Sequence, residues 1–396
     1  MKILIIIIIT LDNSFFELQI IMKKFFLFFL IVLTILNISR GVILSQKNSS
    51  DFQWSPSKLF FSGENHYEYI IKNKEDFKKE GKIILTQNGE YAHGLYVLFY
   101  PLQKLNFKDA KIYWLLLNFI FVSLILFILI KQNTKNEDNL IFILLCLSSI
   151  PFSSHLKLGQ QTLFVMLFLI LPFFYKSKFF SVISGISYFK YNIGYALFLK
   201  FLISKEYFNL LLSLIPVGLG FLFYFFYVDS NFVSLVFQPF KVAMIVENNS
   251  LLKFDLITTF NRLFNENENN IFLIIKYLII IVINIFLINY SKGIKDNLLN
   301  LSFISIIILY CSPHWQHDYV LMFPLLLHSL KTRLSLHSKI NLIIILYFFF
   351  INKIINFIFF DSIGSYLYSF INFLILTSLI INNFFLVKKY KSIRTN

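Results

Sequence analysis

Long apolar runs constrain this chain more than any other feature of its sequence. Residues 112–130 read IYWLLLNFIFVSLILFILI and residues 272–288 read FLIIKYLIIIVINIFLI, with at most one charged residue in either run. A helix that crosses the roughly 30 Å hydrocarbon core of a bilayer needs about 20 such residues. Because lipid offers the backbone no hydrogen-bond partner, each run is predicted to be helical. We therefore predict an all-α, polytopic membrane protein.

Composition and charge support this prediction. Of the 396 residues, 57% are hydrophobic and only 14% are charged, whereas soluble domains carry about 25% charged residues. The net charge of +15 would suggest a nucleic-acid partner in a soluble protein. Here lysine and arginine lie mainly in short loops and in the tail, as the positive-inside rule expects, so no nucleic-acid partner is predicted. Two cysteines, both in apolar runs, exclude a disulfide scaffold.

The apolar runs predict about 10–12 transmembrane helices in a single domain, residues 22–390, followed by the end of a basic tail at 391–396. Met22-Lys23-Lys24 before an apolar run is a typical start of a membrane protein, so residues 1–21 are interpreted as a misannotated extension. A short extra helix is the alternative for that segment. The run 179–203 is interrupted at Lys190, which predicts a broken or re-entrant helix. Whether the run 91–105 crosses the membrane stays open.

The distribution of basic residues predicts the orientation. Basic residues in the tail and in segment 331–339 place both on the cytoplasmic side. Counting spans from either end then places the loops at about 45–90 and 229–270, and the segment 312–318, on the outer face. A multi-pass protein of the bacterial plasma membrane is expected.

The first outer loop contains the first candidate catalytic residue. Asp51 opens the segment DFQWSPSKLFFSGENHYEYI, at the boundary where a lipid-borne substrate meets a polar one. The aromatic residues of this segment suggest packing on the membrane face. Pro56 and Gly63 mark the limits of a short predicted helix. A solvated loop carboxylate is the simpler interpretation of Asp51.

A second group of candidate residues lies in SPHWQHDY, residues 312–319. His314, His317 and Asp318 could be metal ligands, but no ligand spacing typical of zinc accompanies them, so no metal site is predicted. An interfacial loop with an aromatic belt is one interpretation. Recognition of a phosphate by His317 is the other, because ionisable residues at membrane depth are candidates for function.

Two further polar positions interrupt apolar sequence. Gln160 follows Gly159 at the start of a predicted helix, where it could bind an anion or a sugar hydroxyl or simply cap the helix. Lys190 could extend its amine to the membrane surface or neutralise a phosphate in a cavity.

Together these pieces resemble glycosyltransferase family 87 (DUF2029), whose members are mannosyltransferase-like GT-C enzymes. The resemblance covers residues 51 to about 330. It rests on the following residues in this order: Asp51 with Asn65 and Tyr67, Tyr100-Pro101, Trp114 and Asn118, Gly159-Gln160, Lys190, and Ser312-Pro313 with His317. The chain departs from the family pattern at Gln161 and at Tyr191-Asn192, which bears on the identity of sugar and acceptor.

The resemblance implies transfer of a hexose, with mannose as the family expectation, from a polyprenyl-phosphate sugar to a lipid or glycan acceptor. Configuration would invert, with Asp51 as general base. The donor phosphate and sugar would be bound by His317, Lys190, Gln160 and Arg40, and the acceptor or the loop would be shaped by Asn65, Tyr67 and His314. The expected partners are membrane lipid, the lipid-linked donor and the acceptor. The need for a divalent metal and the oligomeric state stay open.

Other classes of protein share this multispan, basic and aromatic pattern. A transporter or flippase of lipid-linked glycans predicts charged residues inside spans and repeated halves, neither of which dominates here. A polysaccharide polymerase or ligase usually relies on arginines in an outer loop, and residues 45–90 contain none.

Overall fold

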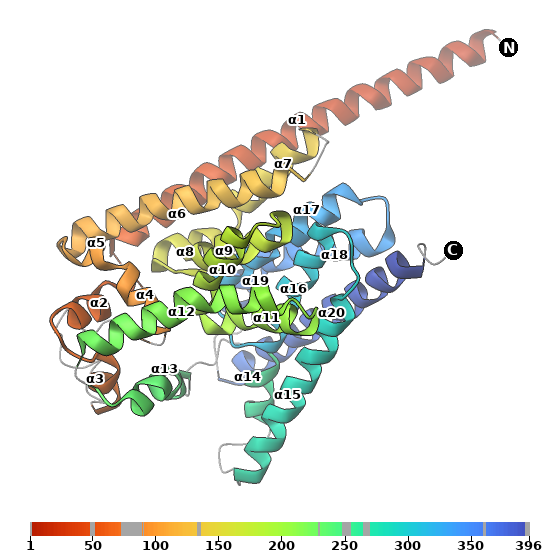
Figure 1. Cartoon of the computed structure of the whole chain (residues 1–396). Helices are drawn as coiled ribbons and strands as arrows, with labels where there is room; N and C mark the ends of the chain where they lie inside the picture. The colour runs from red at the N-terminus through yellow and green to blue at the C-terminus, as the bar shows by residue number, and fades with distance from the viewer. Residues whose placement is uncertain are drawn as a thin grey trace.

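The computed structural model describes residues 2–47, 52–72, 89, 91–132, 136–228, 230–247, 255–263, 270–358 and 362–392. Over these ranges all regular structure is helical and no strand occurs. The helices gather into one bundle, from which the first half of α1 (Lys2–Lys47) projects as a single rod (Figure 1). The all-α prediction is confirmed. Residues 2–21 continue the same helix as the span that follows, so the backbone marks no boundary at Met22.

Several helices are long and apolar enough to cross a membrane, which makes this a multi-pass membrane protein. In the described ranges they are Met22–Lys47, α6 (Phe107–Ile130), α12 (Tyr207–Tyr227), Leu336–Ile355 and Leu367–Tyr390. A sixth span would join two helices that meet at a 48° bend, Asp138–Ser148 and Ile150–Leu158. Shorter apolar helices accompany them, and the total of 10–12 crossings stays a prediction. Lipid-facing positions are exposed, as at Phe226, which is 80% accessible.

The other elements follow in chain order. Before the centre of the chain they are α2 (Trp54–Phe61), α3 (His66–Lys72), α4 (His93–Leu98), α5 (Tyr100–Gln103), α7 (Asn136–Ser148), α8 (Ile150–Leu158), α9 (Thr162–Phe174), α10 (Lys178–Ser184), η2 (Gly185–Phe189) and α11 (Tyr191–Ile203). After it come α13 (Phe232–Glu247), α14 (Leu256–Leu263), α15 (Asn270–Ser291), α16 (Asn297–Cys311), η3 (Gln316–Met322), α17 (Phe323–Lys331), α18 (Leu336–Leu346), the π-helical η4 (Tyr347–Ile351), α19 (Asn352–Ile358) and α20 (Ser362–Ser392).

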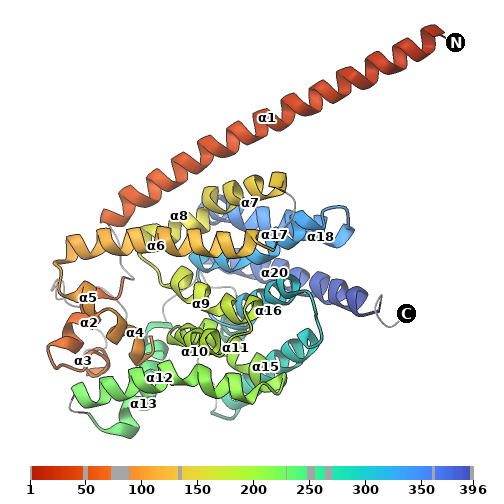
Figure 2. The ribbon, with the colours of Figure 1, turned by 45° about the horizontal axis from the view of Figure 1, so that its top comes forward.

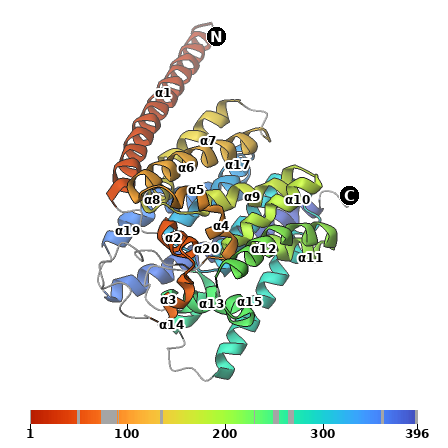
Figure 3. The same cartoon turned by 60° about the vertical axis from the view of Figure 1, so that its left-hand side comes forward.

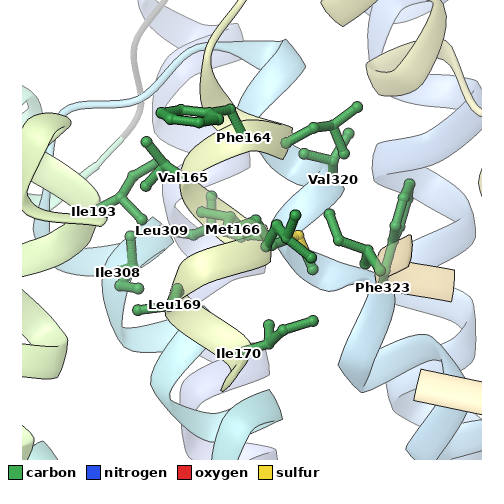
Figure 4. Packing of buried hydrophobic residues seen from close by; sticks show 14 of the residues in the cluster. Phe164, Val165, Met166, Leu169, Ile170, Ile193, Ile308, Leu309, Val320 and Phe323 are labelled. Carbon is green, nitrogen blue, oxygen red and sulfur yellow. The ribbon is translucent and has the colours of Figure 1, made fainter. Parts of the chain in front are cut away.

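The core of the bundle forms around α9, α16 and η3. Helices α9 and α16 are apolar on all sides, a pattern typical of a helix enclosed by others, and nearly all of their side chains are buried. Met166 and Leu169 of α9 lie close to Leu309 of α16, with Val320 of η3 on the other side (Figure 4). Because α9, η3 and α16 pack on one another, residues at their ends are held in a fixed arrangement.

The long helix α1 packs against α6, α7 and α8 at one side of this core (Figure 2). Its contact with α8 is close at Gly41, where an added Cβ would lie 3.2 Å from the Leu156 side chain and from the Ser153 carbonyl oxygen. The glycine therefore sets the separation of the two helices.

The structure shows how two apolar runs of the sequence fold. The run 91–105 forms the short helices α4 and α5, neither of which is long enough to cross a bilayer. The run 179–203 is broken as predicted, because α10 and η2 end at Phe189 and α11 starts at Tyr191. One expectation was wrong: Trp54 and Phe60 do not face the membrane but are buried within the protein.

The contact between α4 and α12 leads to a prediction about stability. A Cβ added at Gly220 would lie 2.4 Å from the Cα of Gly94, whereas one added at Gly218 would meet nothing within 4 Å. Gly220→Ala should therefore lower the free energy of unfolding by about 1–3 kcal/mol, because backbone must move. Gly218→Ala should leave it unchanged or raise it by about 0.5–1 kcal/mol, since alanine favours the helix. Thermal unfolding in detergent tests both, and equal effects would contradict the prediction.

Candidate active site

The break at Lys190 turns a lysine of an apolar run into the core. The N–H groups of Ile193 and Gly194 both donate to the Lys190 carbonyl oxygen, at 2.9 Å, and so start α11. A Cβ at Gly194 would lie 2.5 Å from the Ser187 carbonyl oxygen, so only glycine permits this close return of the chain. The Lys190 side chain keeps 7% of its accessibility. It therefore does not extend to the membrane surface.

The segment after α16 brings a second charged residue to the same place. The Asn192 amide donates to the Pro313 carbonyl oxygen at 2.8 Å, which ties the start of α11 to this segment. The Trp315 N–H donates to Asp318 Oδ2 at 3.1 Å, and the Asp318 N–H donates back to the Trp315 carbonyl oxygen at 2.9 Å. This reciprocal pair fixes the first turn of η3 and directs the Asp318 carboxylate toward α9.

Asp318, Lys190 and Thr162 form a buried polar cluster. Lys190 Nζ donates to Asp318 Oδ1 at 2.8 Å and to Thr162 Oγ1 at 2.8 Å. Thr162 in turn donates its hydroxyl to Asp318 Oδ1. The Asp318 side chain is 2% exposed, so the ion pair is almost fully withdrawn from solvent. Three segments far apart in the sequence therefore meet at one carboxylate.

The ionisation of Asp318 follows from its neighbours. Burial by itself would raise the pKa of this carboxyl, but the charges of Lys190 and His317 and the hydrogen bonds from Lys190 and Thr162 hold the pKa far below its usual range. Asp318 is therefore a carboxylate at neutral pH, and it balances the charge of Lys190.

Two histidines border this cluster. His317 Nε2 lies 3.7 Å from Asp318 Oδ1, and the His317 side chain is 5% exposed. His155, on α8, hydrogen-bonds through Nε2 to Asn118 Oδ1 at 2.8 Å. His155 also lies within electrostatic range of His317, Lys190 and Asp318. The cluster thus combines a carboxylate, an ammonium and two imidazoles, groups able to hold or move protons.

The turn between α8 and α9 closes the other side of the cluster. Gly159 adopts a left-handed conformation, φ +69°, and a Cβ there would lie 2.9 Å from the Phe52 Cβ. The Trp114 indole donates to the Gly159 carbonyl oxygen at 2.9 Å, and Phe52 stacks on Trp114. Gln160 follows, with 3% of its surface exposed. Gly159 is thus the C-cap of α8, and Phe52, the residue after Asp51 in the sequence, lies against it.

The structure brings together some of the predicted site residues but not all of them. Lys190 and His317 share the cluster, and Gln160 lies two residues before Thr162. Arg40 lies on the exposed surface of α1. His314 is buried beside Tyr319, with Nδ1 3.1 Å from the Ser312 carbonyl oxygen. Asp51 lies outside the described residues.

Asn65 and Tyr67 belong to a second polar group, on α3 and the turn before it. Asn65 Nδ2 donates to Ser230 Oγ at 2.7 Å and to Gln238 Oε1 at 2.9 Å. The Tyr67 hydroxyl donates to the Tyr91 carbonyl oxygen at 2.5 Å. These bonds tie the segment 52–72 to α13 and to Tyr91, just before α4.

His314, His317 and Asp318 are the residues that the sequence offers as metal ligands. Over the part of the chain that the structure describes, no three His, Cys, Asp or Glu side chains gather closely enough to hold a metal ion. Asp318 Oδ1 is occupied by Lys190 and Thr162, and His314 Nδ1 faces a carbonyl oxygen.

Sequence reasoning missed three members of this cluster. Asp318 was considered only as a metal ligand, although it is the residue that joins the others. Thr162 and His155 were not identified as site residues, because their partners Asp318 and Asn118 lie 156 and 37 residues away.

Comparison with known proteins gives the family. The profile of "Glycosyltransferase family 87" matches residues 91–313, more than half of the 396 residues. This chain belongs to glycosyltransferase family 87. The matched region includes Thr162 and Lys190 and ends just before the segment that carries His317 and Asp318. No curated protein and no solved structure matches this family 87 glycosyltransferase.

Proposed function

We propose that this family 87 enzyme is of the GT-C type and transfers a hexose, with mannose as the expected sugar, from a polyprenyl-phosphate donor. The acceptor is a lipid or a glycan on the outer face of the bacterial plasma membrane, and configuration inverts. The buried cluster of Lys190, Asp318 and His317 is the observation that supports this most. Charged groups enclosed by apolar helices are costly in a membrane protein and mark functional sites.

In the proposed mechanism Asp51 takes the proton of the acceptor hydroxyl, which attacks the anomeric carbon on the face opposite the phosphate. His317 borders the polar cluster and would donate a hydrogen bond to the departing phosphate, where charge develops. Lys190 contributes by position, because its amine already binds Asp318 and Thr162. The polyprenyl chain would lie among the apolar helices.

The competing interpretation as a transporter is not favoured by membership of a glycosyltransferase family. A polymerase or ligase would use the same chemistry on a growing glycan, so the acceptor distinguishes it from the enzyme proposed here.

The reaction class can be tested by sugar transfer. Purified protein in lipid is given radiolabelled polyprenyl-phosphate mannose, or the nucleotide-linked sugar, with a membrane lipid extract. We expect a labelled product from the lipid-linked donor alone, and a loss of about 10²–10³-fold in His317→Ala if His317 stabilises the leaving phosphate. His337→Ala, on α18, is the matched control and should retain activity. Sugar transfer from the nucleotide-linked donor alone would contradict the proposed reaction. Full activity of His317→Ala would contradict the proposed role of His317.

A further inference from the structure

A buried histidine on α8 is held in a fixed position by α6, and the two helices lie next to each other (Figure 3). Trp114 and Asn118 are one turn apart on α6. The Trp114 indole donates to the Gly159 carbonyl oxygen at 2.9 Å, directly after α8. His155 Nε2 lies 2.8 Å from Asn118 Oδ1. The N–H groups of Gly159 and Gln160 both donate to the His155 carbonyl oxygen, at 3.1 and 3.2 Å. The backbone and the ring of His155 are therefore both fixed.

The orientation of the Asn118 amide determines which nitrogen of His155 carries the hydrogen. Asn118 Nδ2 donates to the Trp114 carbonyl oxygen at 2.9 Å. Because a carbonyl oxygen can only accept, the amide nitrogen lies on that side and Oδ1 faces the imidazole. Oδ1 also can only accept, so His155 Nε2 donates. In the neutral ring, Nδ1 then has a lone pair and no hydrogen. His155 Nδ1 is therefore a hydrogen-bond acceptor.

This acceptor has no hydrogen-bond partner within the part of the chain that the structure describes. The Nδ1 atom is enclosed by protein, and no described donor lies within hydrogen-bonding distance of it. The whole pair is buried, since His155 is 0% and Asn118 1% exposed. An enclosed acceptor without a donor costs free energy, and few such groups occur in native proteins. The nitrogen is therefore a candidate for binding a donor group of a substrate.

The elements around His155 place its ring at the active-site cluster. Nε2 is directed to α6, so Nδ1 lies on another side of the ring. Helix α8 packs on η3, which carries His317 and Asp318. The turn after α8 leads to Thr162, whose hydroxyl binds Asp318. The charged groups that act on the His155 ring are accordingly His317, Lys190 and Asp318. His155 thus adds a neutral acceptor to a cluster whose cations are donors.

We propose that His155 Nδ1 accepts a hydrogen bond from a hydroxyl group of the sugar substrate, and that Asn118 is the positioning residue that holds the required tautomer. The inference rests on the proposed function, because it takes the cluster as the place where sugar binds. A sugar hydroxyl can donate one hydrogen bond to a neutral nitrogen and accept others from nearby cations. The phosphate of a lipid-linked sugar has only acceptor oxygens at neutral pH, so it does not match a bare lone pair. The hydroxyl belongs either to the hexose of the donor or to the acceptor.

The first test measures binding to the full-length protein in phosphatidylcholine nanodiscs. The probes are polyprenyl-phosphate mannose and polyprenyl monophosphate, which lacks the sugar. In His155→Gln the amide nitrogen can still donate to Asn118, but the acceptor at Nδ1 is gone. In Asn118→Ala the ring can adopt the other tautomer. We expect both variants to bind the mannose donor about tenfold more weakly, the effect of one hydrogen bond, and the monophosphate like the wild type.

The control is another histidine that is paired with an asparagine. His337 on α18 has Nδ1 2.7 Å from Asn382 Oδ1, so His337→Gln makes the same replacement outside the cluster. It should bind both probes like the wild type. A general loss of structure in His155→Gln would weaken both probes alike, which would overturn the contact, and size-exclusion chromatography reports the amount of folded protein.

Donors that each lack one hydroxyl of the mannose test the contact itself. In the wild type, removal of the hydroxyl that His155 binds should weaken binding about tenfold. In His155→Gln the same removal should have no further effect, because the contact is already lost. If His155→Gln binds every donor normally but needs about tenfold more acceptor extract for half-maximal transfer, the hydroxyl is that of the acceptor.

The outcomes separate this contact from the proposed reaction. Wild-type donor binding by His155→Gln, together with wild-type dependence of transfer on the acceptor extract, would overturn the contact and leave the reaction intact. Binding that depends on both the mannose and His155, in a protein that transfers no sugar, would support the contact while the proposed reaction fails.

Discussion

Asp318→Ala should lower the free energy of unfolding by about 3–5 kcal/mol, the effect of removing one partner from a buried ion pair. Without the carboxylate, the Lys190 ammonium is left with Thr162 Oγ1 at 2.8 Å as its described partner. The first turn of η3 also loses the acceptor of the Trp315 N–H. Both losses act on the segment that carries His317, so sugar transfer should fall with stability.

Double-mutant cycles distinguish an unpaired charge from a lost contact. Lys190→Met combined with Asp318→Asn removes both charges and should be more stable than Asp318→Ala, because no buried charge remains unpaired. Arg333→Met is the control. Arg333 pairs with Asp138 at 3.0 Å, but the arginine side chain is 58% exposed. Exposed ion pairs contribute only about 0–1 kcal/mol to the free energy of unfolding. Unfolding is followed by tryptophan fluorescence in detergent. Equal losses in Asp318→Ala and Arg333→Met would contradict the argument.

The dependence of stability on pH has a definite sign. The pKa of Asp318 in the folded protein lies below its ordinary value of 3.8. The carboxylate therefore contributes its stabilisation fully above about pH 4 to 5, and this contribution is lost as the pH falls toward the folded pKa. The Asp318→Asn variant lacks this carboxylate, so its free energy of unfolding should fall less than that of the wild type as the pH is lowered.

Asp51→Asn should lower the rate of sugar transfer by about 10²–10⁴-fold, the usual contribution of a general base. The amide keeps the size of the side chain but cannot accept the proton of the acceptor hydroxyl at neutral pH. The neighbouring Phe52 lies against Gly159, whose added Cβ would meet it at 2.9 Å. The segment that begins at Phe52 is thus attached at the turn that leads to Thr162.

The matched control for Asp51 is Glu64→Gln in the same outer loop. Glu64 is exposed, so its replacement should leave the rate unchanged. The measurement is the initial rate of label transfer from polyprenyl-phosphate mannose, with the amount of folded protein checked by size-exclusion chromatography. A rate for Asp51→Asn within tenfold of the wild type, with folded protein, would remove Asp51 from the mechanism.

Much of the fold could be predicted from local sequence. Long apolar runs required helices, because lipid cannot satisfy a bare backbone, and a lysine with two polar neighbours broke the run at residue 190. The identity of the family was also predictable, since its short motifs occur in the expected order. The prediction that Trp54 and Phe60 pack on the membrane face was wrong, because composition alone does not distinguish a lipid-facing ring from a buried one.

By itself the sequence determined that this is a helical, multi-pass family 87 glycosyltransferase, because hydrophobic length and short motifs are properties of neighbouring residues. Only the tertiary structure decided which charges are paired. Lys190 meets Asp318 across 128 residues, which changes its interpretation from a free cation to one half of an ion pair. Coulomb interactions depend on distance in space, and no spacing along a single chain specifies that distance.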